Sequence, residues 1–356
     1  MSSLPDLPGV LSPQQVQATA DAIVELQQPS GKIPWFPGGH ADPWNHVECA
    51  MALVVAGRRD EACRAYDWLS STQLEDGSWF SYYLDDGIED PRRDTNVSTY
   101  VAVGAWHHWK VTGDVGFLEE LFPMVDRAIA FALRLQQPGG EVLWSLEPED
   151  LRPADYALLT GSSSVLLSLR CAVGIAEVLG IERPEWYVAA VRLAEAIAWR
   201  EDSAFADKSR WAMDWYYPVL GGALVGDRAV ARIDERWDQF VMSGFGVRCV
   251  STNEWVTASE TAECVIALDA IGRRDEARRL MTWVQYLREA DGSYWTGCVH
   301  PEEIHFPGGE KTSYTAGAMI LAWDALSDTS PAAGMFRGVG LPAVAVDEPS
   351  LDLDPD

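Results

Sequence analysis

The sequence predicts an all-α fold in which six helical hairpins close into a ring, an (α/α)6 toroid. Amphipathic and predominantly apolar helical segments alternate strictly along the chain, and short turns containing glycine separate them. The run GRRDEACRAYDW at 57–68 returns as GRRDEARRLMTW at 272–283, and an Asp-Gly-Ser turn and an aromatic residue follow each copy. Repeated hairpins cannot bury their apolar faces alone, so we expect them to stack on their neighbours.

Six helices carry one polar and one apolar face, which is typical of helices in an outer ring. The first begins at Ser12-Pro13-Gln14-Gln15, a capping box with proline at the first helical position. We expect these outer helices at residues 13–28, 59–73, 114–136, 184–200, 227–241 and 274–288.

The other six helices are mostly apolar on all sides, which predicts an inner ring buried on both faces. We expect them at 46–56, 95–110, 162–179, 215–224, 257–271 and 312–326, with stop signals at Gly57, Gly180, Gly226 and Gly272. The hairpins together predict a single domain over residues 1–329. Residues 330–356 contain several prolines, lack periodicity and end in acidic residues, so we expect a flexible tail there.

Composition excludes several classes of partner. The chain has 54 acidic and 27 basic side chains, a net charge of −27, which would repel nucleic acid. It shows no basic amphipathic face for an anionic membrane, no stretch of about 18 uninterrupted apolar residues, and no secretory leader. Its six cysteines are scattered, which favours reduced thiols. We therefore expect a cytoplasmic protein, and the sequence does not specify an oligomeric state.

Two segments superficially suggest metal binding. Cys298, His300, Glu302, Glu303 and His305 have suitable chemistry, but their spacing matches no standard structural zinc site. The run DDGIE at 85–89 resembles an aspartate-rich magnesium–diphosphate motif, but it falls in a loop and has no evident companion motif. We predict neither a metal nor a cofactor.

Polar and aromatic residues gather just before and at the start of the inner helices. In a closed ring these positions open onto one end of a central funnel, and the 16 tryptophans suggest an acidic cleft lined by indoles. Capping of helices by aspartate and packing of tryptophan in the core are the competing interpretations. The candidate substrate-binding residues are Trp35, Asp42, Trp44, His46, Glu48, Asp94, Tyr156, Asp214, Trp215, Tyr216, Glu254, Trp255, Glu260 and Tyr314.

The chain resembles two branches of α/α-toroid enzymes. The spacing of Gln73, Gly77 and Trp79 is similar to the QW repeats of terpene cyclases and protein prenyltransferases, but the cyclase Asp-x-Asp-Asp motif is absent. Thr112-Gly113-Asp114, residues 162–180 and the run TSYTAGAMILAWDAL resemble the six-hairpin glycosidases, particularly the glucoamylase-like members. This second resemblance covers nearly the whole chain.

The glycosidase resemblance implies a catalytic pair of carboxyl groups. An acid before the third inner helix protonates the leaving oxygen and a carboxylate before the sixth activates water, which gives inversion. The matching positions are Asp155, where the family usually has glutamate, and Glu310. Inversion needs the two groups about 6.5–9.5 Å apart, and crowding of acids in the funnel would raise one pKa.

The resulting prediction is a glycoside hydrolase with an oligosaccharide or other small-molecule substrate. An isoprenoid enzyme and a non-catalytic toroid that binds a glycan or a protein remain alternatives. A sugar isomerase using funnel histidines such as His46 or His305 is a variant of the first prediction.

Overall fold

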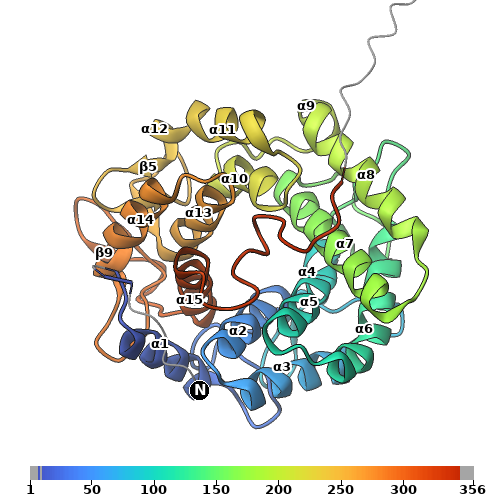
Figure 1. Ribbon diagram of the computed structural model, residues 1–356, viewed down its shortest axis with the longest axis horizontal. Coiled ribbons are helices and arrows are strands. Elements are labelled where there is room, and N and C mark those ends of the chain that lie inside the picture. Colours follow the sequence, from blue (N-terminus) through green and yellow to red (C-terminus); the bar gives the residue numbers. More distant parts are fainter. Residues whose placement is uncertain (1–6, 9, 345–356) are drawn as a thin grey trace, which may run out of the picture.

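The computed structural model describes residues 7, 8 and 10–344, which form two concentric rings of helices (Figure 1). Each inner helix packs on the next, and α15 packs on α2, so that the inner ring closes. The predicted (α/α)6 toroid is therefore confirmed. The inner helices are α2 (Pro43–Val55), α4 (Thr95–Thr99) with α5 (Val101–Thr112), α7 (Leu159–Leu179), α10 (Ala212–Leu220), α13 (Ala258–Ala270) and α15 (Ser313–Ser327).

The outer helices surround this ring in the predicted order. The capping box forms as expected, since the Ser12 amide donates to Gln15 Oε1 at 2.8 Å and the Gln15 amide donates to Ser12 Oγ at 3.3 Å. The outer helices are α1 (Pro13–Leu26), α3 (Arg59–Thr72), α6 (Val115–Leu133), α8 (Pro184–Trp199) with the short α9 (Glu201–Ala204), α11 (Gly226–Glu235) with α12 (Trp237–Phe240), and α14 (Arg274–Trp283) with a 3₁₀ turn, Val284–Leu287.

A repeated turn joins successive outer helices. The side-chain amide of Gln73 donates to the Gly77 carbonyl and to the Met124 carbonyl of α6, both at 2.9 Å. Gln27 and Gln136 make the same pair of bonds to their own turns and to α3 and α8, respectively. The pattern that resembles QW repeats thus ends α1, α3 and α6 and ties each of them to the next outer helix.

The last of these turns closes the outer ring. Gly292 has a φ of +93°, and a Cβ added there would lie 2.3 Å from the Ala18 carbonyl carbon in α1. Only glycine allows so close an approach of two backbones. The C-terminal hairpin therefore docks directly on the first helix.

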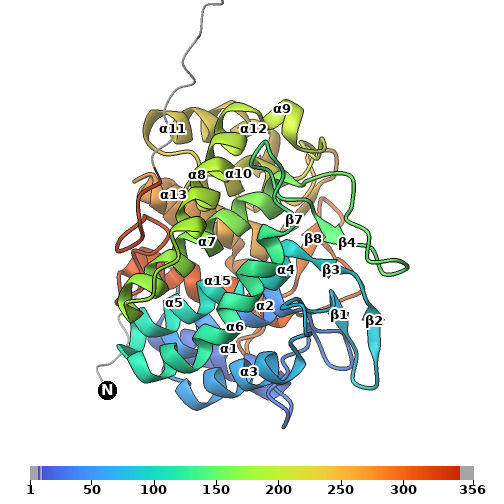
Figure 2. The same ribbon diagram turned by 90° about the vertical axis from the view of Figure 1, so that its right-hand side faces the viewer.

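Short strands at one end of the ring were not expected from the sequence (Figure 2). Segments of two or three residues are too short to show the alternation by which strands are recognised. They form a hairpin of β1 (Tyr82–Tyr83) and β2 (Ile88–Asp90), a pair of β3 (Arg93–Asp94) and β4 (Ser145–Leu146), and an antiparallel sheet in the order β5 (Val241–Met242), β6 (Gly246–Arg248), β7 (Trp255–Thr257), β8 (Gly297–Val299) and β9 (Ile304–His305).

Residues 330–344 lie at the end of the ring opposite the strands (Figure 2). Met335 is buried, Arg337 Nη1 lies 2.5 Å from Asp269 Oδ2, and Arg170 Nε donates to the Pro342 carbonyl at 3.2 Å. A flexible tail was expected from residue 330, whereas this segment packs against the ring through apolar and ionic contacts. The rest of the predicted tail, 345–356, lies outside the described residues.

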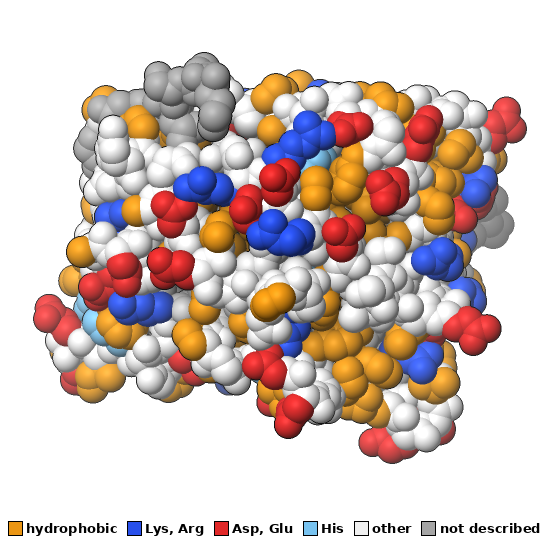
Figure 3. All heavy atoms as spheres, turned by 90° about the horizontal axis from the view of Figure 1, so that it is seen from below, with side chains coloured by type: hydrophobic (Ala, Val, Ile, Leu, Met, Phe, Trp, Pro, Cys, Tyr) orange, Lys and Arg blue, Asp and Glu red, His pale blue; other side chains and the backbone are white. Residues whose placement is uncertain are grey.

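Two further observations concern the sequence-based exclusions. α7 has the length and apolar composition of a membrane-spanning helix, but 83% of its most apolar 18-residue window is buried inside the ring, as in a core helix. On the face shown in Figure 3, acidic and basic side chains are interspersed, and the basic ones do not form a continuous patch.

Candidate active site

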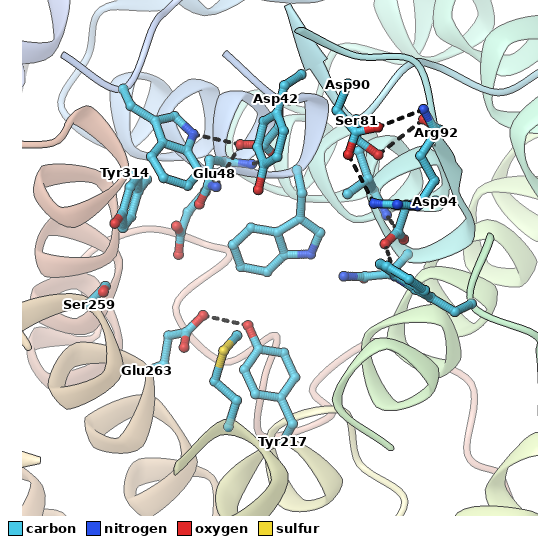
Figure 4. Close-up of a pocket in the computed structure, with 18 of the residues that line it drawn as sticks. Asp42, Glu48, Ser81, Asp90, Arg92, Asp94, Tyr217, Ser259, Glu263 and Tyr314 are labelled. Carbon is cyan, nitrogen blue, oxygen red and sulfur yellow. Dashed lines mark hydrogen bonds and ion pairs between the residues drawn. The ribbon is translucent and has the colours of Figure 1, made fainter. Parts of the chain in front are cut away.

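A cavity of about 320 Å³ lies where the β1–β2 hairpin and the β3–β4 pair meet the inner helices (Figure 4). Its lining contains six carboxyl groups and one arginine, so acidic side chains outnumber basic ones there. The lining residues are Trp35, Asp42, Trp44, Asn45, Glu48, Ser81, Tyr82, Asp90, Arg92, Asp94, Asn96, Val97, Trp144, Met213, Tyr217, Ser259, Glu260, Glu263 and Tyr314.

Two aspartates at the cavity cap inner helices and also bind an indole. Asp42 Oδ1 accepts from the Asn45 amide at 3.0 Å, and its Oδ2 accepts from Trp35 Nε1 at 2.6 Å. Asp94 caps α4 in the same way and accepts from Trp144 Nε1. Burial raises the pKa of Asp94 to about 6 and also raises the pKa of Asp42, while the hydrogen bonds oppose both shifts.

Glu48 of α2 and Glu263 of α13 are the most deeply placed glutamates of the cavity, at 3% and 5% exposure (Figure 4). Glu263 accepts hydrogen bonds from the hydroxyls of Tyr216 and Tyr217, the latter at 2.5 Å. Burial and the charge of Glu263 raise the pKa of Glu48 well above its usual range. Among the described residues, none donates a hydrogen bond to the Glu48 carboxyl that would oppose this shift.

Glu260 lies one turn before Glu263 on the same face of α13 and is less buried. Ser259 Oγ donates to its Oε2 at 2.7 Å. The charge of Glu260 contributes to the raised pKa values of Glu48 and Glu263. Because like charges at a shared site resist simultaneous ionisation, the three carboxyl groups favour the protonated form of Glu48 and Glu263.

The opposite side of the cavity is closer to neutral. Arg92 Nη1 donates to Asp90 Oδ2 at 3.0 Å, and its guanidinium lies 4.6 Å from the ring centroid of Trp144. The arginine charge is thus balanced locally and is not free to attract an anion. An uncharged substrate fits this environment better than an anionic one.

Aromatic rings form much of the remaining wall. Trp44 stacks on Tyr100 with ring centroids 4.3 Å apart, and its Nε1 donates to Ser164 Oγ at 3.1 Å. Trp35 meets Tyr314 edge to face at 4.8 Å. Rings fixed in this way offer apolar faces beside hydrogen-bonding carboxylates, a combination suited to the apolar faces and hydroxyls of a sugar.

Comparison with known proteins identifies the family. The chain is 50% identical over 342 residues, 96% of its length, to an MMP endo-(1,4)-3-O-methyl-α-D-mannosidase of Mycolicibacterium hassiacum, and the match covers 94% of that protein. The chain belongs to this mannosidase family. It is therefore a glycoside hydrolase with a sugar or oligosaccharide substrate, which decides against the isoprenoid and non-catalytic alternatives. No family model matches the chain.

Solved structures share the fold of this mannosidase-family enzyme at low sequence identity. A glycosidase variant in complex with glucose has a TM-score of 0.68 at 16% identity, covering 89% of this chain and 97% of the other. A GH63 mannosylglycerate hydrolase from Thermus thermophilus has a TM-score of 0.66 at 13% identity, covering 86% and 99%. A D-mannose isomerase has a TM-score of 0.65 at 11% identity, covering 90% and 100%.

Half of the predicted substrate-binding residues of the enzyme line the cavity. Asp42 and Asp94 each cap an inner helix and line the cavity, so one carboxylate can do both. The residues that the structure brings together are Trp35, Asp42, Trp44, Glu48, Asp94, Glu260 and Tyr314.

Three others are buried behind the cavity wall. His46 accepts from the Ile33 amide at Nδ1 and bonds the Ala65 carbonyl through Nε2, and burial lowers its pKa to about 4. Trp215 donates to the Arg232 carbonyl at 3.0 Å, and Asp214 accepts from the amide and hydroxyl of Thr160. These side chains hold helices together.

The remaining four lie around the cavity or away from it. The Tyr216 hydroxyl donates a hydrogen bond to Glu263, although Tyr216 itself does not line the cavity. Tyr156 packs on Trp144 with ring centroids 5.4 Å apart. Glu254 is exposed and pairs with Arg248 at 3.1 Å, while Trp255 Nε1 donates to the Phe306 carbonyl at 3.2 Å.

The two carboxyl groups implied by the resemblance, Asp155 and Glu310, lie in different parts of the structure. Asp155 is exposed in the loop before α7 and does not line the cavity. Glu310 lines a different hollow, with Glu25, Phe36 and Lys311. The two carboxyl groups therefore do not face a common cavity, as a substrate bound between them would require.

Sequence reasoning included Glu260 but missed Glu263. Glu263 and Glu260 are three residues apart on a helix, a spacing that puts them on one face. The signal that could have identified Glu263 is that it is a second acid on the same face of the apolar helix α13 as Glu260. The other lining residues not predicted are Asn45, Ser81, Tyr82, Asp90, Arg92, Asn96, Val97, Trp144, Met213, Tyr217 and Ser259.

Proposed function

We propose that the enzyme is an endo-acting α-mannosidase that cleaves (1,4)-linked chains of 3-O-methylated mannose, the activity named for its relative. The cluster of Glu48, Glu260 and Glu263 in an aromatic-walled cavity is the observation that carries this proposal. Identity of 50% along nearly the whole chain supports the choice of substrate. The balanced charge of Arg92 agrees with an uncharged sugar.

In the proposed reaction Glu48 is the general acid and Glu260 the general base. Glu48 gives its proton to the glycosidic oxygen as the bond from that oxygen to the anomeric carbon breaks. Water attacks the anomeric carbon and passes a proton to Glu260, so the sum of the steps is hydrolysis. Burial is the main reason that Glu48 keeps its proton. Glu263, whose own pKa burial raises to about 8 against two tyrosine hydrogen bonds, adds a negative charge when it ionises.

We assign this role to Glu48, not to Asp42 or Asp94, because their hydrogen bonds differ. Both oxygens of Asp42 and both of Asp94 already accept hydrogen bonds from amides or indoles. Such bonds favour the ionised form and would have to break for the group to present a proton. Glu48 carries no such restraint.

The test is turnover of a 3-O-methylated (1,4)-linked oligomannoside, followed by mass spectrometry of the products. We expect Glu48→Gln and Glu260→Gln to lower kcat by about 10²–10⁴-fold, with the melting temperature checked for each variant. Asp155→Asn and Glu310→Gln are matched controls outside the cavity and should retain turnover. Loss of activity in these controls, with Glu48→Gln fully active, would return the catalytic pair to the positions implied by resemblance.

We further propose that hydrolysis inverts the anomeric configuration, because a base that activates water, not a nucleophile, is assigned to Glu260. Proton NMR recorded at early reaction times would show a β-configured reducing end. An α-configured first product would contradict inversion without affecting the substrate assignment.

We also propose that the enzyme works in a reducing compartment inside the cell. Five of the six cysteines are buried and all six are free thiols, which agrees with a protein that does not rely on disulfides. Fractionation of cells that express the enzyme, followed by immunodetection, tests this location.

A further inference from the structure

The hollow that contains Glu310 is a second concave site, located where the first and last repeats meet. It has a volume of about 580 Å³. The loops that enter α2 and α15 form one side of it, and α1 with the turn before β8 forms the other. Its lining combines apolar side chains, among them Leu26 and Phe36, with charged ones, namely Glu25, Asp291, Glu310 and Lys311.

This hollow adjoins the cavity along two segments of the chain. Trp35 lines the cavity, and the next residue, Phe36, lines the hollow. Tyr314 lines the cavity, and Lys311, three residues earlier, lines the hollow. The two segments are bonded to each other, because the Ser313 amide donates to the Trp35 carbonyl at 2.7 Å. Trp35 and Tyr314, which meet edge to face at 4.8 Å, therefore stand between the two sites.

Phe36 is held in place while part of its surface stays free. A Cβ added at Gly39 would lie 2.7 Å from Cε2 of Phe36, so the ring packs directly on the backbone of its own turn. The Gly39 amide donates to the Phe36 carbonyl at 2.9 Å, which closes that turn. Phe36 is only partly buried. A ring fixed in this way offers apolar surface to a ligand at a low cost in side-chain entropy.

The charged side chains of the hollow suit a neutral ligand with hydroxyl groups better than an ion. Lys311 Nζ lies 3.9 Å from Asp291 Oδ2 and 4.7 Å from the ring centroid of Trp295, so its charge is balanced nearby and acidic groups remain in excess. Within the described part of the chain, no group of three His, Cys, Asp or Glu side chains is arranged to hold a metal ion. Glu25 is exposed and Glu310 partly exposed, so both carboxylates are accessible to hydroxyl donors.

We propose that this hollow is a further sugar-binding subsite, which holds a unit of the (1,4)-linked chain outside the cavity. Phe36 packs on the apolar face of that unit, and Glu25 accepts from its hydroxyls. The inference rests on the proposed function, because an endo-acting enzyme binds a chain that continues beyond the unit at the point of cleavage. Contacts this far from the reacting bond are the same in the ground and transition states, so they lower KM and leave kcat unchanged. Substitutions in the hollow, Glu310→Gln included, should therefore retain kcat.

The experiment measures kcat and KM for 3-O-methylated (1,4)-linked α-oligomannosides of increasing length. We expect the wild-type KM to fall as the chain becomes long enough to reach the hollow. Phe36→Ala should raise the KM of the longest chain by about tenfold, and Glu25→Ala by about threefold. Neither variant should change the KM of the shortest chain that is cleaved. Tyr187→Ala is the matched control, because it removes an exposed aromatic ring of α8 that lines neither site.

The outcomes separate this inference from the proposed function. If the wild-type enzyme cleaves the chains but its KM does not fall with length, or Phe36→Ala raises KM for none of them, only the inference is overturned. An equal rise for short and long chains would mean that Phe36 acts on the cavity through Trp35, which also overturns the inference.

Two further results are decided by additional measurements. If the wild-type enzyme cleaves no chain, the proposed function fails. Calorimetric titration of the longest chain into the wild-type enzyme and Phe36→Ala then tests the hollow alone, and absent or equal binding overturns the inference too. If Phe36→Ala does not fold, Glu25→Ala decides the outcome, because its side chain is exposed on α1 and its loss leaves the core intact.

Discussion

Single residues at this site combine structural and chemical roles. Asp94 caps a helix, binds an indole and faces the cavity with a pKa of about 6. A cap and a ligand-binding carboxylate are thus not exclusive interpretations of one aspartate. Glu263 also combines two roles, since its hydrogen bonds to two tyrosine hydroxyls fix its position while its charge raises the pKa of Glu48.

The role of Glu263 predicts a directional change in the pH profile. Its charge raises the pKa of Glu48, so Glu263→Gln should lower that pKa and move the alkaline limb of the kcat/KM profile to lower pH. Tyr217→Phe should shift the limb in the same direction, because it removes a hydrogen bond that favours ionised Glu263 and so weakens the charge that acts on Glu48.

The measurement is kcat/KM from pH 4 to 9 for the wild-type enzyme and both variants. Tyr294→Phe is a matched control, since this buried hydroxyl bonds Gln285 away from the cavity and should not move the limb. An alkaline limb that stays in place in Glu263→Gln would mean that Glu263 does not tune the catalytic acid.

The sequence-based predictions that line the cavity are those for which position in the repeat determines the direction of the side chain. Asp42, Glu48 and Tyr314 lie at or near the starts of inner helices, and the ring brings those starts together. Asp155 and Glu310 were chosen by resemblance of position, and the loops that carry them run outside the cavity. Loop paths depend on local backbone pairing, which helical periodicity does not encode.

At the scale of elements, long helices and short strands differ in how well the sequence defines them. All twelve predicted helical segments match observed ones within four residues at each end when α12 and the 3₁₀ turn are counted with α11 and α14, because their apolar periodicity extends over several turns. The strands were missed because each contains only two or three residues. They nevertheless matter for function, since β2 and β3 carry Asp90 and Asp94 to the cavity.

The repeated turn predicts a position of high sensitivity to substitution. Gly77 has a φ of +90°, and an added Cβ would lie 2.2 Å from the Arg127 carbonyl oxygen in α6. Gly77→Ala therefore combines backbone strain with an overlap that α6 can relieve only by moving. We expect a loss of about 2–4 kcal/mol in the free energy of unfolding, measured by urea denaturation.

Gly113→Ala separates the two effects. Gly113 has a φ of +69°, and nothing lies within 4 Å of an added Cβ, so only backbone strain of about 1–2 kcal/mol is expected. Equal losses in the two variants would show that contact between outer helices at the turn contributes little.

At the scale of the whole molecule, the ring separates stabilising contacts from the site. The cavity lies at the end of the ring that carries the short strands, and residues 330–344 pack against the opposite end (Figure 2). There Arg337 bridges α13 and the end of α15, because its guanidinium binds both Asp269 and Asp328. Asp269 is only 2% exposed, so its charge depends on nearby cations.

This arrangement predicts that stability can be lost without loss of catalytic efficiency. Arg337→Gln leaves the buried Asp269 with Arg274 at 3.4 Å as its remaining ion pair, and should reduce the free energy of unfolding by about 1–3 kcal/mol. Arg279→Gln, which removes an exposed pair with Glu276, should cost less than about 0.5 kcal/mol. Because the cavity is at the other end, kcat/KM at a temperature where both variants are folded should equal that of the wild-type enzyme.

Adding Asp269→Asn to Arg337→Gln should recover part of the loss by removing the uncompensated buried charge, and an additive further loss would show that Arg337 stabilises the ring by packing instead of charge.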